Sequence, residues 1–379
     1  MDIKELREEL NKIDDVLVPL FERRMDMAEQ IADYKKKNNI AVSDRTRERE
    51  VIYRMTGKVK PTLAPYAKVL YNTLFDLSKT YQTSLIRPES KLKRDIGDAL
   101  ERTDKTFPER AVVACQGTEG AYSQFACDRM FKYPSIMYVD SFESVFKAVD
   151  KGLCRYGILP LENSTAGSVT AVYDLMEKYR FYIVGGTKVC VGHALLANPG
   201  ASLAGIREIF SHEQAIHQCG AFISSLDGVK VTVCSNTAEA AKAVSKSGRT
   251  DAAAICSPDC AELYNLAELA AGVSDTDNNY TRFICISKEI EIYPGANRTS
   301  LMTRLPHKPG ALYNVISRFA SLGVNLTKLE SRPVPGSDFE FMFYFDMDAS
   351  VHSPEMAELI TQLENEIPEL IYLGSYNEF

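Results

Sequence analysis

The sequence lacks the features that mark several classes of protein. Among its 379 residues, no apolar run approaches the roughly 18 residues that a membrane-spanning helix needs. The opening segment MDIKELREEL alternates charges and has no apolar stretch, so we expect no signal peptide and a cytoplasmic protein. Neither a G-x-G-x-x-G segment nor a P-loop occurs, so no nicotinamide or nucleotide cofactor is predicted.

Cysteines and histidines are present, but their spacing does not indicate a metal site or a disulfide framework. The 9 cysteines all lie between Cys115 and Cys285, their number is odd, and no C-x-x-C occurs. We therefore expect reduced thiols that pack as small apolar side chains. His212 and His217 are five residues apart, which does not align them on one helix face, so we predict no metal ligand set.

The net charge of −7 is unevenly distributed. Residues 109–379 carry 22 lysines and arginines against 32 aspartates and glutamates. No long basic stretch combines with aromatic residues, so nucleic acid is not an expected partner, and neither is a membrane. An anionic ligand must therefore be bound by local cations and not by the overall field of the protein.

Residues 1–85 are predicted to form helices. Apolar residues from Ile3 to Tyr34 repeat at intervals of three and four, which predicts a first helix reaching about Lys37. That helix would be about 55 Å long, too long for a small domain to cover, so we expect a partner helix from a second chain. Further helices are expected from Ser43 or Asp44 and after Pro61. Residues 86–108 are bracketed by prolines and rich in charge, which favours a solvated linker with a weak helix inside it.

From residue 109 the pattern changes to short apolar runs that alternate with helical segments, which is typical of an α/β domain. The run KAV followed by a glycine and a strand occurs at 147–159 and again at 242–255, and Asp140 and Asn236 look like the caps of the two helices. We interpret residues 109–288 as two similar α/β lobes with a cleft between them. Residues 297–379 then follow the order βαββαβ, which predicts a ferredoxin-like α+β module.

Several polar residues of the helical region share helix faces. Arg24 and Lys35 are eleven apart, nearly three full turns, and Ser78 and Gln82 are i, i+4. Asp44, Arg47 and Glu48 also share one face, whereas Arg7 is rotated by about 260° from Arg24 at about 100° per residue, so that Arg7 is suited to serve a second subunit. Taken singly, such residues are most often solvated surface charges.

Their order and spacing, however, resemble the all-helical chorismate mutase family. The segments L-R-E-E-L, E-R-R-M-D-M-A, Tyr34-Lys35, D-R-T-R-E-R and S-K-T-Y-Q carry this resemblance over residues 1–84. It implies an interlocked dimer that holds the dianion chorismate for a pericyclic rearrangement to prephenate, without a nucleophile or proton transfer. It also implies a pocket lined by Arg24, Lys35, Arg47, Glu48, Ser78 and Gln82, with Asp44 beside it and Arg7 reaching into the neighbouring site. In this pocket Lys35 and Gln82 would address the ether oxygen, and Glu48 would accept from the ring hydroxyl.

Four further segments place small or polar residues where strands end or helices begin, the usual position of ligands in α/β sheets. They are G-T-E-G-A-Y-S (117–123), P-L-E-N-S-T-A-G-S-V (160–169), S-H-E-Q-A-I-H-Q-C (211–219) and N-Y-T-R-F (279–283). In this order they resemble prephenate dehydratase over residues 109–288, which implies a fold like that of periplasmic binding proteins. The resemblance implies that Thr281 assists departure of the ring hydroxyl as a positioned donor. It also implies that the carboxylates and hydroxyl of prephenate are bound by Asn163, Ser164, Ser211, Gln218 and Arg282.

The last module carries H-K-P-G-A-L (307–312) and N-L-T-K-L-E-S-R-P (325–333), which resemble an ACT regulatory domain of the dehydratase type. In that family, phenylalanine binds between the turn of one chain and the second segment of its neighbour. The resemblance implies a phenylalanine site at or beside Gly310, Ala311, Leu312, Asn325, Glu330, Ser331 and Arg332. A dimerisation module without a ligand is the alternative.

Together the three resemblances imply a bifunctional enzyme of phenylalanine biosynthesis. It would convert chorismate to prephenate and prephenate to phenylpyruvate, need no cofactor or metal, respond to phenylalanine, and form a homodimer or homotetramer. Two alternatives stay open at this point. One is a catalytically silent amino-acid sensor, which the cationic set and Thr281 argue against. The other is an enzyme that uses arogenate, the amino-acid counterpart of prephenate.

Overall fold

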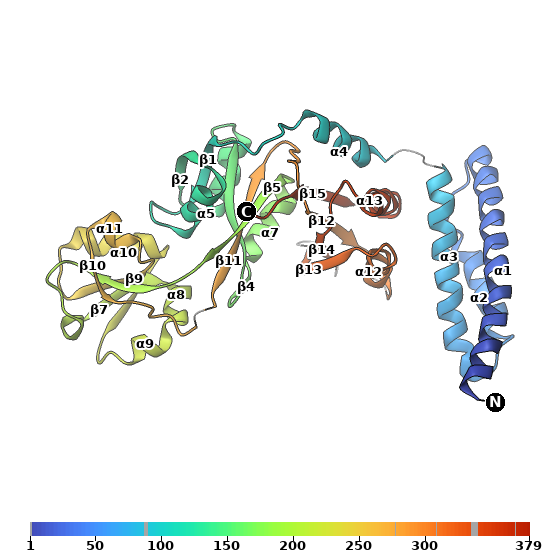
Figure 1. Ribbon diagram of the computed structural model, residues 1–379, viewed down its shortest axis with the longest axis horizontal. Coiled ribbons are helices and arrows are strands. Elements are labelled where there is room, and N and C mark those ends of the chain that lie inside the picture. The colour runs from blue at the N-terminus through green and yellow to red at the C-terminus, as the bar shows by residue number, and fades with distance from the viewer. Residues whose placement is uncertain (1, 87–89, 277, 308, 335–339, 368) are drawn as a thin grey trace. The chain divides into compact units, whose positions relative to one another are not determined.

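The computed structural model describes residues 2–86, 90–276, 278–307, 309–334, 340–367 and 369–379 (Figure 1). Its contacts divide the chain into two units, one of Met1–Arg94 with Ala357–Glu369 and one of Asp95–Met356 with Leu370–Phe379. Within the predicted linker 86–108, residues 87–89 lie outside the described residues, and Lys91–Arg102 form helix α4. No helix in the described ranges combines the length and the apolar character needed to cross a membrane.

The first unit contains the predicted long helix α1 (Ile3–Asn38), followed by α2 (Arg45–Thr56), a short 3-10 turn η1 (Pro61–Leu63) and α3 (Ala64–Ile86). Asp2 and Glu5 form a capping box at the start of α1, in which Asp2 Oδ1 accepts from the backbone nitrogen of Glu5 at 2.9 Å. Asn39 ends the helix in the left-handed conformation, with φ of 50°. The sequence thus encodes both ends of α1.

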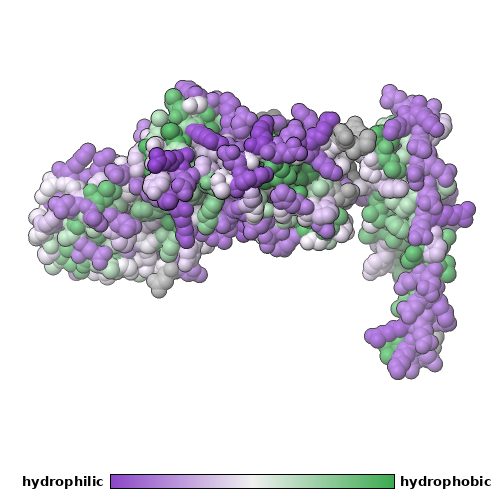
Figure 2. Space-filling view, turned by 45° about the horizontal axis from the view of Figure 1, so that its top comes forward, coloured by the Kyte–Doolittle hydropathy of each residue, from purple (hydrophilic) through white to green (hydrophobic). Residues whose placement is uncertain are grey.

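Helix α1 leaves a long apolar surface uncovered by its own chain. Leu10, Ile13 and Leu17 are 58, 60 and 58% exposed, and the buried residues of this helix are Ala28 and Ala32. Figure 2 shows green, apolar areas on the surface of the helical unit. Contiguous exposed apolar surface of this extent is of the kind that protein–protein contacts bury.

The second unit begins with an α/β lobe built on a six-stranded sheet. Its main strand order is β2-β1-β3-β11-β5, with β4 paired to β3, and the strands are β1 (Arg110–Gln116), β2 (Tyr133–Val139), β3 (Tyr156–Asn163), β4 (Gly167–Ser168), β5 (Tyr182–Cys190) and β11 (Tyr280–Ser287). Strands β1, β2 and β3 are parallel, whereas β11 is antiparallel to both of its neighbours. The helices of this lobe are α5 (Tyr122–Met130), α6 (Phe142–Asp150) and α7 (Thr170–Tyr179).

The second lobe repeats this plan, as the internal echo in the sequence predicted. Its sheet order is β10-β6-β9-β7-β8, from β6 (Ala194–Ala197), β7 (Glu208–His212), β8 (Lys230–Cys234), β9 (Ala252–Cys256) and β10 (Ala267–Ala270). Strands β8-β7-β9 are parallel, like β2-β1-β3 of the first lobe. The remaining elements are η2 (Leu203–Gly205), α8 (Glu213–Gln218), α9 (Gly220–Ser224), α10 (Thr237–Ser247) and α11 (Cys260–Tyr264).

The two predicted helix caps differ in outcome. Asn236 caps α10, because its Oδ1 accepts from the backbone nitrogen of Glu239 at 2.8 Å. The predicted cap Asp140 is wrong by one residue, since Ser141 caps α6 and accepts from the backbone nitrogen of Ser144 at 3.2 Å. Both residue types are good caps, so composition alone did not separate Asp140 from its neighbour.

The chain crosses between the lobes twice, after β5 and before β11. The two crossing segments bind each other through the backbone, with Val191 N donating to Asn279 O at 2.8 Å and Val273 N donating to His193 O at 3.0 Å. This arrangement joins the lobes side by side and leaves the ends of their parallel strands facing the space between them.

After β11 the chain forms a second, four-stranded antiparallel sheet, here called the C-terminal sheet. Its order is β13-β14-β12-β15, from β12 (Arg298–Leu305), β13 (Asn325–Pro333), β14 (Phe341–Asp348) and β15 (Leu370–Tyr376). Helices α12 (Ala311–Ser321) and α13 (Pro354–Glu366) complete the order βαββαβ that the sequence predicted. Phe319 of α12 contacts Phe345 of β14 at a ring-centroid distance of 5.2 Å.

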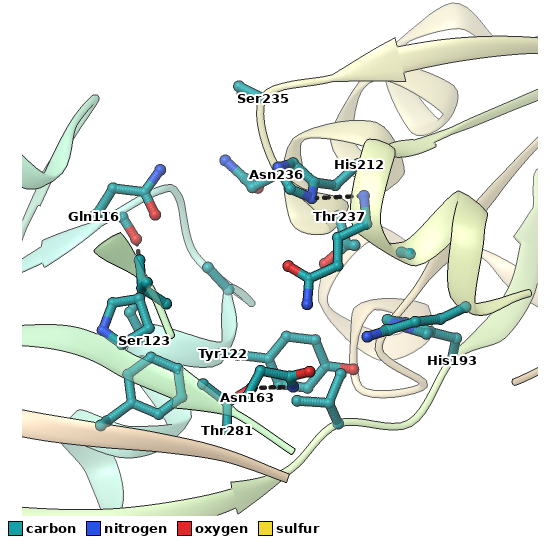
Figure 3. A pocket seen from close by; sticks show the side chains of 18 of the residues that line it. Gln116, Tyr122, Ser123, Asn163, His193, His212, Ser235, Asn236, Thr237 and Thr281 are labelled. Atoms are coloured by element: carbon teal, nitrogen blue, oxygen red, sulfur yellow. Dashed lines mark hydrogen bonds between the residues drawn. The ribbon is translucent and has the colours of Figure 1, made fainter. Parts of the chain in front are cut away.

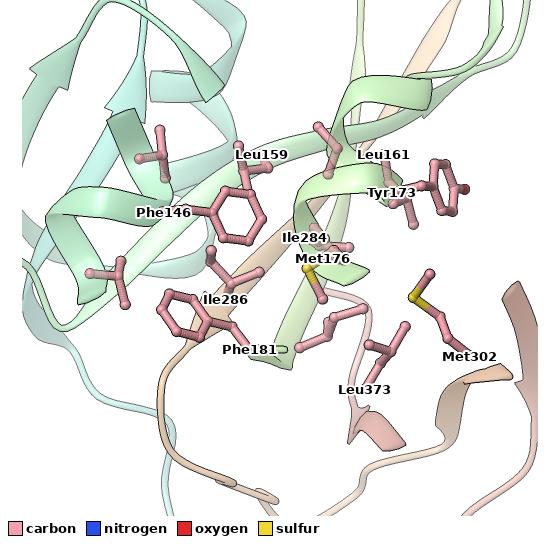
Figure 4. Close-up of a cluster of buried hydrophobic side chains, with 14 of the residues drawn as sticks. Phe146, Leu159, Leu161, Tyr173, Met176, Phe181, Ile284, Ile286, Met302 and Leu373 are labelled. Carbon is pink, nitrogen blue, oxygen red and sulfur yellow. The ribbon is translucent and has the colours of Figure 1, made fainter. Parts of the chain in front are cut away.

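The C-terminal sheet shares a buried core with the first lobe (Figure 4). Tyr173 of α7 packs edge to face on Tyr344 of β14 at 4.9 Å, and Met302 and Leu373 belong to the same cluster as Phe146. The residues after β15 continue along the edge of β5. There, Gly186 N donates to Asn377 O at 2.9 Å, and Phe379 N donates to Gly186 O at 2.7 Å.

Candidate active sites

A cavity of about 450 Å³ lies between the two lobes (Figure 3). Residues of the first lobe line one side, residues of the second lobe line the other, and the crossing segments contribute Val191 and His193. Its described lining consists of Gln116, Ala121, Tyr122, Ser123, Phe142, Pro160, Asn163, Val169, Val191, His193, His212, Gln214, Ala215, Gln218, Ser235, Asn236, Thr237, Thr281 and Phe283. Three of the predicted dehydratase residues, Asn163, Gln218 and Thr281, are therefore brought together.

Thr281 and Asn163 are paired across two neighbouring strands. They lie opposite each other in the β3–β11 ladder, and Asn163 Nδ2 donates to Thr281 Oγ1 at 2.9 Å. The amide of Asn163 is oriented by its own oxygen, which accepts from the backbone nitrogens of Thr165 at 3.1 Å and Ala166 at 2.9 Å. Because Thr281 accepts from the amide, its hydroxyl proton is free to be donated to a ligand.

Gln218 connects the second lobe to this pair. Its Nε2 donates to Thr165 Oγ1 at 3.0 Å, and its Oε1 accepts from Asn279 Nδ2 at 3.0 Å. Asn279 in turn accepts from Asn163 Nδ2 at 2.7 Å. His193 Nε2 lies 3.2 Å from Gln218 Oε1. The amides form a continuous network from α8 across the cavity floor to Thr281, which fixes where each donor points.

The described lining of the cavity contains no lysine, arginine, aspartate or glutamate. Burial lowers the pKa of His193 and of His212, so both imidazoles are predominantly neutral at pH 7. Positive potential comes instead from helix starts on both sides of the cavity. Tyr122 and Ser123 open α5, and Thr237 opens α10. Backbone N–H groups at such ends attract anions.

Three other predicted dehydratase residues are not in the cavity lining. Ser211 is fully buried in β7 and donates to Ile255 O at 2.6 Å. Arg282 follows Thr281 in β11 and is directed to the opposite face of the sheet, where it contacts Asp346. Ser164 Oγ bonds to the backbone at the start of β11, accepting from Tyr280 N at 2.9 Å. For Ser211 and Arg282 the reason is strand alternation, since successive side chains face opposite ways.

Several lining residues were not named individually from the sequence. Tyr122, Ser123 and Gln214 lie within the predicted ligand segments, whereas Gln116, His193, Ser235 and Thr237 lie outside them. Most of them stand at the carboxyl end of a strand or in the first turn of the next helix, and that position was the available signal. His193 lies in a crossing segment, which no local pattern reveals. His212, considered in the sequence only as a metal ligand, both lines the cavity and accepts from the backbone nitrogen of Gln214 at 3.3 Å.

In the helical unit, two buried polar atoms lack partners among the described residues. They are Arg24 Nε on α1 and Gln82 Oε1 on α3. The guanidinium carbon of Arg24 lies 5.8 Å from the ring centre of Phe75, and Ser78 is buried one turn before Gln82. A buried donor and a buried acceptor without partners are costly unless a ligand binds them.

The other predicted residues of this unit are less enclosed. Lys35 Nζ donates to Val42 O at 2.6 Å, and Glu48 Oε1 lies 3.3 Å from the nitrogen of Lys79, a cation not singled out from the sequence. Asp44 caps α2 by accepting from the backbone nitrogen of Arg47 at 3.0 Å. The side chain of Arg47 is exposed and lies 3.2 Å from Glu50 Oε2.

Arg7 lies far from Arg24 along α1. Their offset of 17 positions corresponds to about 25 Å at 1.5 Å per residue, and Arg7 is exposed. It therefore cannot reach the same pocket as Arg24 within one chain.

The residues predicted to bind phenylalanine divide into two groups. Gly310 has φ of 85° and caps α12 ahead of Ala311 and Leu312, while Asn325 and Ser331 of β13 are exposed. The other two side chains contact the first lobe. Glu330 accepts from Ser168 Oγ at 2.6 Å, and Arg332 Nε lies 3.1 Å from Asp174 Oδ1. Within the described residues, no group of three or more His, Cys, Asp or Glu is arranged to hold a metal ion.

Comparisons with known proteins identify relatives for both parts of the chain. The family model of prephenate dehydratase matches residues 113–291, and that of type II chorismate mutase matches residues 6–83. An arogenate dehydratase/prephenate dehydratase of Arabidopsis thaliana is 33% identical over 313 residues, which is 79% of this chain and 80% of the relative. The bifunctional chorismate mutase/prephenate dehydratase of Escherichia coli is 27% identical over 379 residues, or 98% of this chain and 95% of the relative. The crystal structure of prephenate dehydratase in complex with L-Phe from Arthrobacter aurescens covers 70% of this chain and 89% of its own, with a TM-score of 0.65 and 28% identity.

Proposed function

The chain belongs to the prephenate dehydratase family, and we propose that it is a bifunctional enzyme of phenylalanine biosynthesis. Its helical unit rearranges chorismate to prephenate, and its two-lobed domain converts prephenate to phenylpyruvate, CO₂ and water. The observation that carries the second activity is the Asn163–Thr281 hydrogen bond of 2.9 Å on the floor of the cavity between the lobes. Relatives with both activities in one chain support the fusion.

The dehydration needs little more than positioning. The bond between the ring and its carboxylate breaks, the electron pair moves into the ring, and the C–O bond to the ring hydroxyl breaks. The leaving hydroxide takes up a proton and departs as water. Thr281 donates a hydrogen bond to this departing oxygen, and solvent supplies the net proton. Because aromatisation drives the reaction, a positioned donor is sufficient, and the neutral hydroxyl needs no shifted pKa.

The cavity favours prephenate over arogenate. The two substrates differ in the side chain, where prephenate carries a keto group and arogenate an ammonium. A buried ammonium requires a carboxylate or a set of acceptors, and the described lining contains no aspartate or glutamate. Amide and hydroxyl donors such as Gln116 and Ser123 suit a keto group and carboxylates. Comparing kcat/KM for the two substrates tests this preference, and equal values would contradict it.

The helical unit suits the chorismate rearrangement. Arg24 Nε and Gln82 Oε1 supply a donor and an acceptor that lack protein partners among the described residues. We assign Arg24 to a substrate carboxylate, Lys35 and Gln82 to the ether oxygen, and Glu48 to the ring hydroxyl. The neighbouring Lys79, 3.3 Å from Glu48, keeps that carboxylate from facing the anionic substrate uncompensated.

A second copy of the chain completes the mutase site. The exposed apolar face of α1 around Leu10 and Leu17 supplies the contact surface, and the partner contributes its Arg7. Replacing Leu10 with Glu should dissociate the mutase dimer and lower mutase turnover at low protein concentration, while leaving the cavity between the lobes unaffected. Sedimentation or light scattering measures the first effect. A variant that stays fully dimeric with normal turnover would contradict this interface.

The C-terminal module is proposed to be an ACT domain that binds phenylalanine and inhibits the enzyme. Gly310, Ala311 and Leu312 offer the N–H groups of a helix start to the carboxylate of the effector, and Asn325 and Ser331 lie on the exposed face of β13. Glu330 and Arg332, which contact Ser168 and Asp174, link this site to the dehydratase lobe. Ser331→Ala should raise the phenylalanine concentration needed for inhibition without altering either basal activity. An unchanged response would remove Ser331 from the site.

A cytoplasmic location is proposed on the basis of thiol chemistry. All nine cysteines are free, and seven of them are buried within the two lobes. Buried free thiols are typical of proteins in reducing compartments.

The decisive experiment supplies the purified chain with chorismate alone and follows phenylpyruvate, with and without phenylalanine. Phenylpyruvate that phenylalanine suppresses is the expected result. Prephenate that accumulates without phenylpyruvate would leave the mutase standing and overturn the role of Thr281. Phenylalanine binding without any turnover would favour a sensor.

A further inference from the structure

Two successive residues of β11, Thr281 and Arg282, point to opposite faces of the six-stranded sheet. In the β3–β11 ladder, Thr281 lies opposite Asn163, and Arg282 lies opposite Glu162. The first pair faces the cavity, and strand alternation turns the second pair to the other side. The register is regular across these two pairs and shifts only between Arg282 and Phe283.

The C-terminal sheet encloses the guanidinium of Arg282, which is 4% exposed. Nη1 lies 2.5 Å from Asp346 Oδ2 on β14, and Nη2 donates to the hydroxyl of Tyr376 on β15 at 2.8 Å. Nε lies 2.6 Å from Glu378 Oε1 in an ion pair that lacks hydrogen-bond geometry. Charge-assisted contacts on three sides of a planar group leave it little freedom to move.

Asp346 is itself held by the C-terminal sheet. It is fully buried, and its Oδ1 accepts from Ser300 Oγ on β12 at 2.5 Å and from the Tyr376 hydroxyl at 3.1 Å. Tyr344 donates to the same Ser300 oxygen at 3.1 Å. The orientation of Asp346 therefore reports the arrangement of β12, β14 and β15 relative to one another.

Glu162, which pairs with Arg282 in the ladder, also contacts the C-terminal sheet. Lys328 of β13 lies 2.5 Å from Glu162 Oε2 and also donates to Ser168 Oγ at 3.0 Å, while Arg282 Nη1 lies 3.6 Å from Glu162 Oε1. Burial raises the pKa of Glu162, but the two cations outweigh that effect and lower it overall, so the carboxylate stays ionised. Both strands that carry the cavity pair are thus anchored to the C-terminal sheet.

We propose that Asp346 positions Thr281 through Arg282, and that Lys328 positions Asn163 through Glu162 in the same way. This inference rests on the proposed dehydratase function. Arg282 is a positioning residue that touches no substrate, in place of the binding role expected from its sequence motif. A displacement of β14 against the first lobe shifts Arg282 and hence the adjoining Thr281, so a change in the C-terminal sheet alters the Asn163–Thr281 alignment.

The test replaces Asp346 with Asn, which keeps the shape and removes the charge at a site outside the cavity. Misplacement of a reacting group by a distant change lowers rates by about 10- to 100-fold. We expect kcat for prephenate to fall by at least about 10-fold at this scale, with KM changed less than about 2-fold. Chorismate mutase turnover, which depends on the helical unit, should stay normal.

Two further variants separate positioning from general damage. Glu378→Gln removes the negative charge of a second carboxylate that contacts the Arg282 guanidinium. Glu378 is less buried, at 18% exposed, and its replacement should lower kcat in the same manner. Asp174→Asn removes the exposed ion pair with Arg332 at the same junction, and should leave kcat unchanged because it touches neither β3 nor β11. In the Asp346→Asn/Glu378→Gln double variant, the losses should be less than multiplicative, since both act on Arg282.

Normal kcat in both Asp346→Asn and Glu378→Gln would overturn the positioning role of Arg282, as would an effect confined to KM. If Asp346→Asn does not fold, the comparison of Glu378→Gln with Asp174→Asn decides, and equal kcat for those two variants would overturn it. A wild-type chain that turns over no prephenate would instead overturn the proposed function.

Discussion

The two proposed active sites handle closely similar dianions with opposite physical means. The helical unit presents fixed cations, with Arg24 and Lys35 on α1, and leaves much of its apolar surface exposed. The cavity between the lobes is lined from both sides by residues of one chain, and its described lining consists of neutral groups. In the proposed function, one site depends on point charges and a second copy of the chain, and the other depends on oriented dipoles held by a hydrogen-bond network.

The two reactions require different kinds of anion binding. The rearrangement of chorismate is concerted, so two carboxylates must be held in place while charge develops on an ether oxygen, and cations do both. The loss of CO₂ from prephenate removes a carboxylate. A fixed cation that paired tightly with that group would hold back its departure, because it stabilises the ground state. Helix N–H groups and amides bind it more weakly and still orient it.

The largest expected effect separates the two chemistries. Thr281→Ala removes the donor to the leaving hydroxyl, and dehydration should slow by about 10²-fold or more, the usual scale for a positioned proton donor. Mutase turnover should stay normal, because Thr281 belongs to the other unit. Separate assays with prephenate and with chorismate check this. Equal losses in both would mean that the substitution acts on folding.

A substitution in the mutase site should have the converse effect, of somewhat smaller size. Arg24→Ala removes one charge-assisted contact, worth about 1.5–3 kcal/mol, so mutase kcat/KM should fall by about 10- to 100-fold while prephenate turnover is unaffected. Arg23→Ala, next to it on α1 but exposed, is the matched control. If Arg23→Ala were the damaging variant of the two, the assignment of the pocket face would be wrong.

Ionic strength should affect kcat/KM differently at the two sites. Raising ionic strength from about 0.01 M to about 0.1 M shortens the Debye length from about 30 Å to about 10 Å. Mutase kcat/KM should decrease several-fold as its cations are screened. Dehydratase kcat/KM should hold or rise slightly, since residues 109–379 carry 32 acidic against 22 basic residues and repel a dianion. Parallel decreases would show that unrecognised cations serve the cavity.

The smallest effect concerns the acid sensitivity of the lobes. Burial lowers the folded-state pKa of His193 below the value of about 6.5 that holds in the unfolded chain. The unfolded state therefore binds more protons, and this contribution to stability is present above about pH 6.5 and is lost as the pH falls through the folded pKa. Each kcal/mol shifts Tm by about 2–4 °C in a domain of this size. Tm of the lobes should fall by a few degrees below pH 6.5.

Two variants assign that shift to a residue. His193→Gln should flatten the dependence of Tm on pH, whereas replacing the exposed His352 with Gln should not. Thermal melts between pH 7.5 and pH 5.5, chosen to span the histidine value of about 6.5, measure both. A melt of His193→Gln that keeps the wild-type slope would place the acid sensitivity elsewhere, with His212 as the next residue to test.

The sequence alone predicted the elements well because each is specified locally. The period of the apolar residues in α1 and the proline before α3 lie within one segment, and the repeated KAV runs revealed two lobes before any sheet was known. The capping error at Asp140 shows the limit of such signals, because aspartate and serine cap equally well and only the backbone path chose Ser141.

The candidate site was harder to predict, because a motif does not show which of its side chains point into the cavity. Asn163, Gln218 and Thr281 line the cavity, whereas Ser211 and Arg282 belong to the same motifs and face away. A motif in one dimension does not say which neighbour points inward, although strand alternation already forbids Thr281 and Arg282 from sharing one face. His193 belongs to the site through the crossing of the chain between lobes, which no local pattern encodes.

The pairing of residues 377–379 with β5 also protects the fold from self-association. Strand β5 ends the six-stranded sheet, and an open strand edge is a template for another chain. Asn377 and Phe379 occupy the backbone groups of Gly186, and the ring of Phe379 lies 4.9 Å from that of Phe107. A change that displaces these residues from β5 would expose the edge and promote aggregation.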